Sequence, residues 1–261
     1  MDPFIESLYR RLQIDDFHFV EIESKKRILP TQVKDLRKYL AKKKKVKHEK
    51  TTTFFDQFLD TPQMDLFKKG ASLRLRYKRN GTKVVLQYKG PGFLEEGLLY
   101  RSEFSSKPLA HLIREESHHD MIHFSDTTIR EVLDVYARGS MTRAMKRHLG
   151  AGTVSRISYG PIISSYQKDK YSVDLGSAFL EPSLDRIYAF HINKTGLHPL
   201  SMFWEFENEV KAEGHSLKAK LEHIPDLLEF DEKLAEEFDL KVEPLDKYHR
   251  CTSIFLPEKF S

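Results

Sequence analysis

The sequence predicts an α+β fold in which an antiparallel β-sheet has helices packed on it. Three observations lead to this prediction. Several segments alternate apolar residues with polar or charged ones, which is the period of a strand with two different faces. The dipeptide Asn80-Gly81 lies between two such segments and is a strong hairpin signal. Longer segments with helical spacing stand before, between and after the strand candidates.

Composition and charge are those of a soluble globular protein. Of the 261 residues, 39% are hydrophobic and 31% are charged. No apolar run approaches the roughly eighteen residues of a membrane span, and the N-terminus lacks the apolar stretch of a secretion signal. The single cysteine, Cys251, excludes an internal disulfide and a cysteine-rich zinc site. We therefore expect a cytoplasmic protein without membrane contact, and the net charge of +4 is too small to indicate nucleic acid.

The N-terminal part of the chain is expected to alternate helices with strands. Apolar residues predict a short amphipathic helix within residues 1–15, and we assign residues 1–18 to a helical extension ahead of the main domain, residues 19–256. Residues 17–29 alternate as a strand does, and a second helical pattern then runs into the basic stretch 42–50. Four more strand candidates follow at 51–60, 71–79, 82–90 and 98–106.

The C-terminal part is expected to begin with helices and then return to strands. Residues 107–150 form a mainly helical segment. The segment 176–203 contains Pro182, Gly196 and Pro199 and has little period, so we expect an irregular insertion there. The remaining elements are strands at 152–163, 169–175 and 201–214, a helix at 216–238 and a strand or tail at 246–255.

Most strand candidates are apolar on one face and largely ionic on the other. In the first strand, Glu21, Glu23 and Lys25 share one face, because successive side chains point to opposite sides. If helices cover the apolar face, the ionic face is either in solvent on an open sheet or lines a closed, water-filled barrel. The other polar faces carry Arg74, Arg76 and Lys78; Lys83, Gln87 and Lys89; Arg101 and Glu103; Arg156; and Glu205, Glu207 and Glu209.

These charges indicate a site for a polyphosphate and a metal ion. Three glutamates at alternate positions of one strand repel one another unless a cation lies between them. Carboxylate oxygens suit Mg²⁺ or Mn²⁺. The arginines and lysines of the other strands suit a multiply charged anion, since guanidinium groups match the geometry of phosphate.

The motifs, taken in order, resemble those of the CYTH superfamily, also known as the triphosphate tunnel metalloenzymes. The stretch EIESK at 21–25 matches the ExExK signature of the family. Residues 54–91 are similar to its block of a D-T-P turn, an R-L-R strand and a strand ending in K-G-P. The resemblance implies an eight-stranded antiparallel β-barrel with helices packed outside and a charged tunnel inside. Later family motifs are matched by YRSEF (100–104), SRI (155–157), YSVDLG (171–176), EFENE (205–209) and DKY (246–248).

The resemblance also implies roles for individual residues. It implies catalytic roles for Glu21, Glu23, Lys25 and Glu207. The implied metal ligands are Glu21, Glu23, Asp174 and two of Glu205, Glu207 and Glu209. The implied phosphate-binding residues are Lys25, Arg74, Arg76, Lys89, Arg101, Arg156 and Lys247, with Glu103 positioning a basic neighbour. Two positions depart from the family pattern, because Ser105 and Asp246 stand where many members have Glu and Ser.

The function implied is hydrolysis of a triphosphate compound with Mg²⁺ or Mn²⁺ as cofactor. Two alternatives stay open: a class IV adenylate cyclase that forms cyclic AMP from ATP, and a non-catalytic binder of polyphosphate or nucleic acid that uses the basic stretch 42–50. A pure phosphate binder has no use for paired carboxylates, so we expect a small triphosphate compound as partner and no nucleic acid. Whether the chain forms a homodimer stays open.

Overall fold

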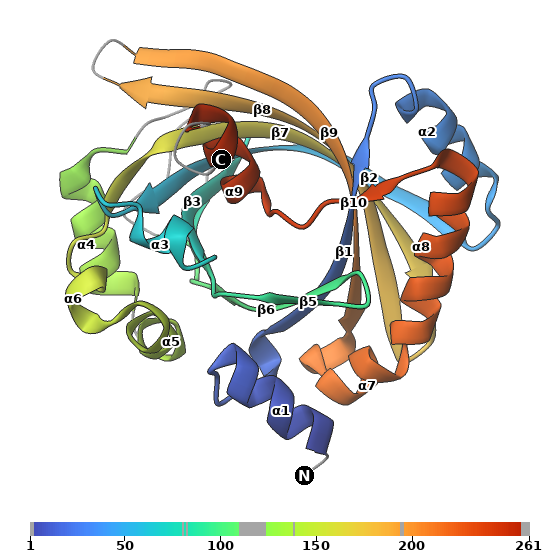
Figure 1. Cartoon of the computed structure of the whole chain (residues 1–261), viewed down its shortest axis with the longest axis horizontal. Coiled ribbons are helices and arrows are strands. Elements are labelled where there is room, and N and C mark those ends of the chain that lie inside the picture. The colour runs from blue at the N-terminus through green and yellow to red at the C-terminus, as the bar shows by residue number, and fades with distance from the viewer. Residues whose placement is uncertain are drawn as a thin grey trace.

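Eight antiparallel strands close into a ring (Figure 1). The structure is a computed structural model that describes residues 3–79, 81, 83–109, 124–137, 139–193 and 196–256. Around the ring the order is β1, β9, β8, β7, β2, β3, β4 and β6, and β6 pairs back with β1. These strands are β1 (Val20–Ile28), β2 (Val46–Asp60), β3 (Ser72–Lys78), β4 (Val84–Lys89), β6 (Leu98–Ser105), β7 (Ser158–Asp174), β8 (Ala178–Asn193) and β9 (Gly196–Ala212).

The ring is uneven, since β7 and β9 have 17 residues each and β4 has 6. Two short strands, β5 (Phe93–Glu95) and β10 (Lys241–Val242), extend the sheet outside the ring from β6 and β1. The antiparallel α+β tunnel fold expected from the sequence is confirmed. The basic stretch 42–50 runs from the last residue of helix α2 (Val33–Lys42) into the beginning of β2.

Helices surround the ring, with α4, α5 and α6 on one flank and α2 and α8 on the opposite flank (Figure 1). Helix α9 packs against β7, β8 and β9. The helices are α1 (Pro3–Leu12), α2 (Val33–Lys42), α3 (Asp65–Lys68), α4 (Asp126–Tyr136), α5 (Ser140–Leu149), α6 (Ala151–Val154), α7 (Leu217–Glu222), α8 (Ile224–Phe238) and α9 (Lys247–Phe255).

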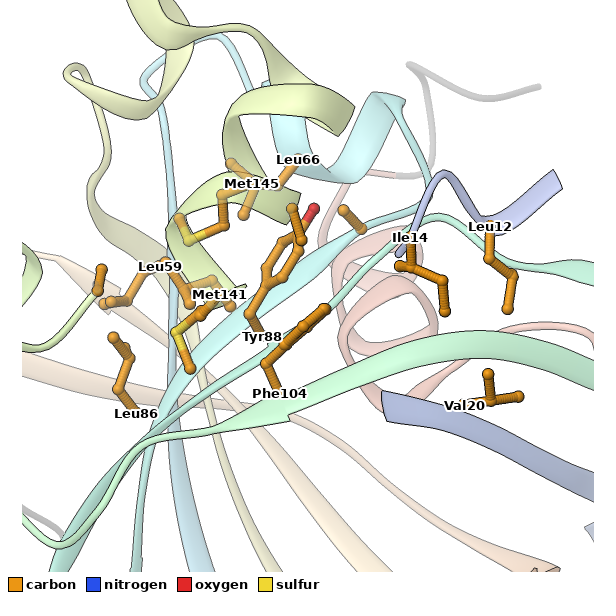
Figure 2. Close-up of a cluster of buried hydrophobic side chains, with 14 of the residues drawn as sticks. Leu12, Ile14, Val20, Leu59, Leu66, Leu86, Tyr88, Phe104, Met141 and Met145 are labelled. Carbon is orange, nitrogen blue, oxygen red and sulfur yellow. The ribbon is translucent and has the colours of Figure 1, made fainter. Parts of the chain in front are cut away.

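The apolar faces of the strands are buried beneath these helices. Leu86 and Tyr88 of β4 share one buried cluster with Met145 of α5, part of which Figure 2 shows. On the opposite flank, Leu36 of α2 packs in a second cluster with Phe206 of β9. Because neighbouring residues of a strand point to opposite faces, this burial turns the alternate, charged residues toward the interior of the ring. Packing of the core therefore positions the site.

The C-terminal strands are more regular than expected. Residues 178–193 form β8 and residues 196–203 begin β9, and the two strands pair from Ala178 opposite Ala212 to Asn193 opposite Gly196, so the irregular insertion expected at 176–203 is wrong. The two prolines of this segment lie where the pairing between neighbouring strands is interrupted. Pro182 pairs with Asn208 of β9 but with none of the described residues of β7, and Pro199 lies beside a register shift. Residues 158–174 form the single strand β7, where the sequence suggested two, because β2 pairs with it nearly from end to end.

Two other segments differ from the prediction in their helices. The segment 246–255, expected to be a strand or tail, is helix α9. Its N-cap is Asp246, whose side chain accepts a hydrogen bond from the backbone N–H of His249 at 2.9 Å. Serine, the residue of the family pattern, caps helices equally well, so this departure preserves the start of the helix. The single helix expected at 216–238 is divided into α7 and α8, with Pro225 in the first turn of α8.

His249 is held in its charged form. Its Nδ1 lies 2.6 Å from Asp246 Oδ1 and its Nε2 lies 3.1 Å from the carbonyl oxygen of Phe67. Because both partners are acceptors, both ring nitrogens donate. Burial acts to lower the pKa of His249, but the Asp246 carboxylate outweighs burial and raises this pKa above its ordinary value. The charge therefore stabilises the fold fully below about pH 6.5, and its contribution is lost as the pH rises through the folded pKa.

We expect His249→Gln to lower the free energy of unfolding by about 1–2 kcal/mol at pH 6 and by less at pH 9. Urea unfolding of both proteins at the two pH values measures this difference. The exposed His48 provides the control substitution His48→Gln, which should change little at either pH. An equal loss at pH 6 and pH 9 would contradict a charged His249.

Candidate active site inside the tunnel

A polar cavity of about 270 Å³ lies inside the ring. Its wall consists of inward-facing residues of the ring strands and of the first residues of α9, together with the N-cap residue Asp246. Glu23 and Glu205 do not line this cavity, although both are buried. The residues that the sequence suggested and that do line it are Glu21, Lys25, Arg74, Arg76, Lys89, Arg101, Glu103, Glu207, Glu209 and Lys247.

Two arginines of β3 are held in place by Asp56, a residue of β2 that the sequence reasoning missed. Arg76 donates from Nε and Nη2 to the two carboxylate oxygens of Asp56, both at 2.8 Å, and Arg74 Nη1 lies 3.0 Å from Asp56 Oδ2. Burial acts to raise the pKa of Asp56, but the two guanidinium groups outweigh it and lower this pKa. Asp56 is directly opposite Arg76 in the strand register, and only that register would have revealed it.

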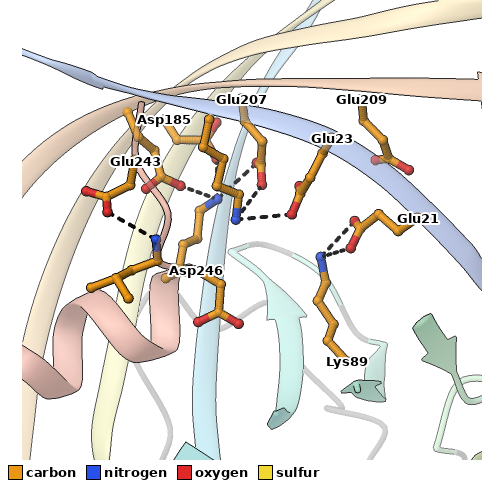
Figure 3. Close-up of polar contacts among 12 residues, drawn as sticks. Glu21, Glu23, Lys89, Asp185, Glu207, Glu209, Glu243 and Asp246 are labelled. Atoms are coloured by element: carbon orange, nitrogen blue, oxygen red, sulfur yellow. Dashed lines mark hydrogen bonds and ion pairs between the residues drawn. The ribbon is translucent and has the colours of Figure 1, made fainter. Parts of the chain in front are cut away.

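The two glutamates of the ExExK motif form ion pairs with the cations of β4 and β6, and Figure 3 shows the pair of Lys89 with Glu21. Lys89 Nζ lies 2.8 Å from both oxygens of Glu21. Arg101 donates from Nε to Glu21 at 2.7 Å and from Nη2 to Glu23 at 2.5 Å. Burial acts to raise the pKa of Glu21, but Lys89 and Arg101 lower it well below its usual range. For Glu23, burial prevails and the pKa is raised.

A cluster of three carboxylates lies where β8 and β9 pair. Asp185, Glu205 and Glu207 each offer an oxygen, and these oxygens lie within 4.8 Å of one another. Asp185 is opposite Glu205 in the register, and both are 0% exposed. We refer to these three residues as the acidic triad. Asp185 and Glu205 lie behind the cavity wall, whereas Glu207 lines the cavity and so connects the triad to it.

The acidic triad fits a divalent cation. Within the described residues, the oxygens of Asp185 and Glu205 accept no hydrogen bond of suitable geometry, and their cationic contacts are ion pairs. The Lys247 ammonium lies within ion-pair distance of all three triad residues, at 2.6 to 3.0 Å. Burial acts to raise the pKa of Glu207, but its lysine neighbours, Lys247 first, lower it well below its usual range. A set of buried carboxylate oxygens is the kind of ligand set that Mg²⁺ or Mn²⁺ prefers.

Two residues suggested by the sequence lie outside the site. Asp174 is exposed at the end of β7 and accepts a hydrogen bond from the Gly176 backbone at 2.8 Å, and the aspartate that lies beside Glu205 and Glu207 is Asp185 instead. Arg156 is exposed between α6 and β7 and donates to Asp65 at 3.2 Å. The SRI motif ends a helical turn and precedes the strand, so Arg156 does not face inward. From β7, the cavity is lined by Tyr166, Lys168 and Lys170.

Glu209 lies on the cavity wall beside Lys211, with 2.8 Å between Glu209 Oε2 and Lys211 Nζ. Burial raises the pKa of Glu209 to about 7, with a further rise from the Glu21 and Glu103 carboxylates and an opposing effect from Lys211. Glu209 does not belong to the acidic triad, so the structure separates it from Glu205 and Glu207.

Comparisons with known proteins agree with this architecture. The HpAC1 protein of Hippeastrum, described as having a dominant triphosphatase activity, is 18% identical over 89% of this chain and 95% of its own, with a TM-score of 0.56. The PH1819 protein of Pyrococcus horikoshii is 20% identical over 92% of this chain and 99% of its own, with a TM-score of 0.51. At these identities the likeness shows the fold alone. No curated protein matches the chain.

Two further findings concern the whole chain. None of the helices in the described residues has the length and apolar character that a membrane crossing requires. The sequence model of the CYTH domain matches residues 20–155, which are more than half of the chain and contain β1, β2, β3, β4 and β6 of the ring. With the ring of eight strands and the charged interior, this match shows that the chain belongs to the CYTH domain family, the triphosphate tunnel metalloenzymes.

Proposed function

We propose that the protein hydrolyses a triphosphate compound inside the tunnel with the help of Mg²⁺ or Mn²⁺. The observation that carries this proposal is the meeting of two opposite sets of charges in one cavity. Arginines and lysines of β3, β4, β6 and β7 form one part of the wall, and Glu207 joins the cavity to the buried acidic triad. A multiply charged anion suits the first set, and a divalent cation suits the second.

The proposed reaction needs mainly alignment and charge stabilisation from the protein. Asp56 fixes the guanidinium groups of Arg74 and Arg76 before substrate arrives, so they need little rearrangement to bind phosphate oxygens. Glu21 holds Lys89 and Arg101 in the same way. In this proposal the ExExK carboxylates act first as holders of phosphate-binding cations.

The metal ion would be held by Asp185, Glu205 and Glu207. When bound, a divalent ion supplies a Lewis acid that withdraws charge from phosphate oxygens. Lys25 lies between a glutamate of the ExExK motif and a member of the acidic triad, with Nζ 3.3 Å from Glu23 and 3.4 Å from Glu207. It therefore places a positive charge between the ExExK motif and the acidic triad. This position suits binding of a phosphate group that approaches the metal.

We expect the metal-free protein, prepared with EDTA, to release no phosphate from tripolyphosphate, ATP or thiamine triphosphate. Added Mg²⁺ or Mn²⁺ should restore phosphate release, because the acidic triad would then hold the cation that the proposed reaction needs. Product analysis by chromatography also detects cyclic AMP. Metal-dependent cyclic AMP from ATP, without phosphate release, would identify a cyclase and contradict a triphosphatase.

We expect Glu205→Gln to reduce metal-dependent phosphate release at least 100-fold, since it removes one charge from the acidic triad. The matched control is Glu243→Gln. Both glutamates are buried and both lie near Arg250 Nη1, at 3.8 Å for Glu205 and 3.3 Å for Glu243, but Glu243 pairs with Arg27 outside the cavity. Circular dichroism confirms folding of both variants. Equal activity of the two variants would refute the proposed metal site.

A further inference from the structure

Lys247 occupies the centre of the acidic triad. Its Nζ lies 2.9 Å from Asp185 Oδ2, 2.6 Å from Glu205 Oε1 and 3.0 Å from Glu207 Oε2. The ammonium group is therefore in contact with one oxygen of each carboxylate. Lys247 is only 5% exposed, so water does little to screen this interaction.

No other cation of the described residues contacts all three carboxylates. Lys25 and Lys168 reach Glu207 alone among them, at 3.4 and 3.2 Å. Arg250 reaches Glu205 alone, at 3.8 Å. Lys247 is thus the one cation of the described residues at the point that all three carboxylates share, and it brings a single positive charge there. A divalent cation would bring two charges to the same point, so the acidic triad is better matched to such an ion than to Lys247.

We infer that Lys247 is an internal counter-ion of the acidic triad and that a divalent metal ion displaces its ammonium group on binding. This inference rests on the proposed metal site. It gives Lys247 two successive positions, one among the carboxylates without metal and one in the cavity with metal. The expected role from sequence, phosphate binding, belongs to the second position.

The two cations exclude each other for a geometric reason. Oxygen ligands lie about 2.1 Å from Mg²⁺, so an ion shared by the three carboxylates would occupy the space that Nζ occupies. The displaced group stays nearby, because Lys247 begins α9 and the adjacent Asp246 is bound to Arg101 at 3.0 Å. Its charge is then added to the cavity wall. Metal and phosphate therefore favour each other's binding through Lys247.

The first test measures Mn²⁺ binding without substrate, by electron paramagnetic resonance of free Mn²⁺, in wild-type protein and in Lys247→Met and Lys168→Met. We expect Lys247→Met to bind Mn²⁺ at least tenfold more tightly than wild type, because its competitor is gone. Lys168→Met removes a half-buried ammonium that contacts only Glu207 of the triad, and it should change the affinity less than threefold. Equal affinity of Lys247→Met and wild type would overturn the inference.

Lys247→Met leaves the carboxylates without their cation, so a second measurement uses the wild-type protein. Hydrogen exchange of peptides covering residues 246–255 is compared with and without Mn²⁺. Displacement of Lys247 removes three contacts that hold the first turn of α9, so we expect faster exchange there with Mn²⁺. Unchanged exchange in α9 at saturating Mn²⁺ would overturn the inference.

The outcome for this inference can be separated from the outcome for the proposed function. Phosphate release from tripolyphosphate is measured on the same wild-type sample. Displacement of Lys247 by Mn²⁺ without phosphate release would contradict the function and support the exchange of cations. Metal-dependent phosphate release with equal Mn²⁺ affinity in wild type and Lys247→Met would support the function and overturn the exchange.

Discussion

Charges that point into a closed ring of strands have to be compensated inside it, because a buried carboxylate or ammonium without a partner is strongly destabilising. Because helices pack on the outer face of the ring, the charged residues of the inner face find their partners inside it. Asp56 is compensated by Arg74 and Arg76, and Glu21 by Lys89 and Arg101. The polar interior is thus a network of ion pairs around a cavity that can contain water and a charged ligand.

The same compensation prepares the site for its ligands. Cations held by buried carboxylates keep fixed positions, and fixed positions are what electrostatic stabilisation of a phosphoryl group requires. The acidic triad brings three buried carboxylates together around one shared ammonium group, since Lys247 alone among the described residues contacts Asp185, Glu205 and Glu207 together. This gathering of carboxylates, beside a wall of cations, is the physical basis for proposing a metal-dependent reaction on triphosphates.

Much of this arrangement could be predicted from the sequence, because alternation of apolar and charged residues reports directly on strand faces. It identified the inward faces of β1, β3, β4, β6 and β9. It missed β8, because Pro182 together with Gly196 and Pro199 of β9 suggested an irregular segment, and with β8 it missed Asp185. Asp56 was missed for another reason. Its role depends on which residue of β3 lies opposite, and a single sequence does not contain the register.

The most direct test is the position of the metal. Crystals with Mn²⁺ and a hydrolysis-resistant triphosphate analogue would be measured for the anomalous scattering of manganese. The account predicts a manganese peak in contact with Asp185, Glu205 and Glu207 inside the ring, with density for the analogue extending from it toward Arg74 and Lys89. A manganese peak on the outer surface, with the analogue bound outside the ring, would contradict it.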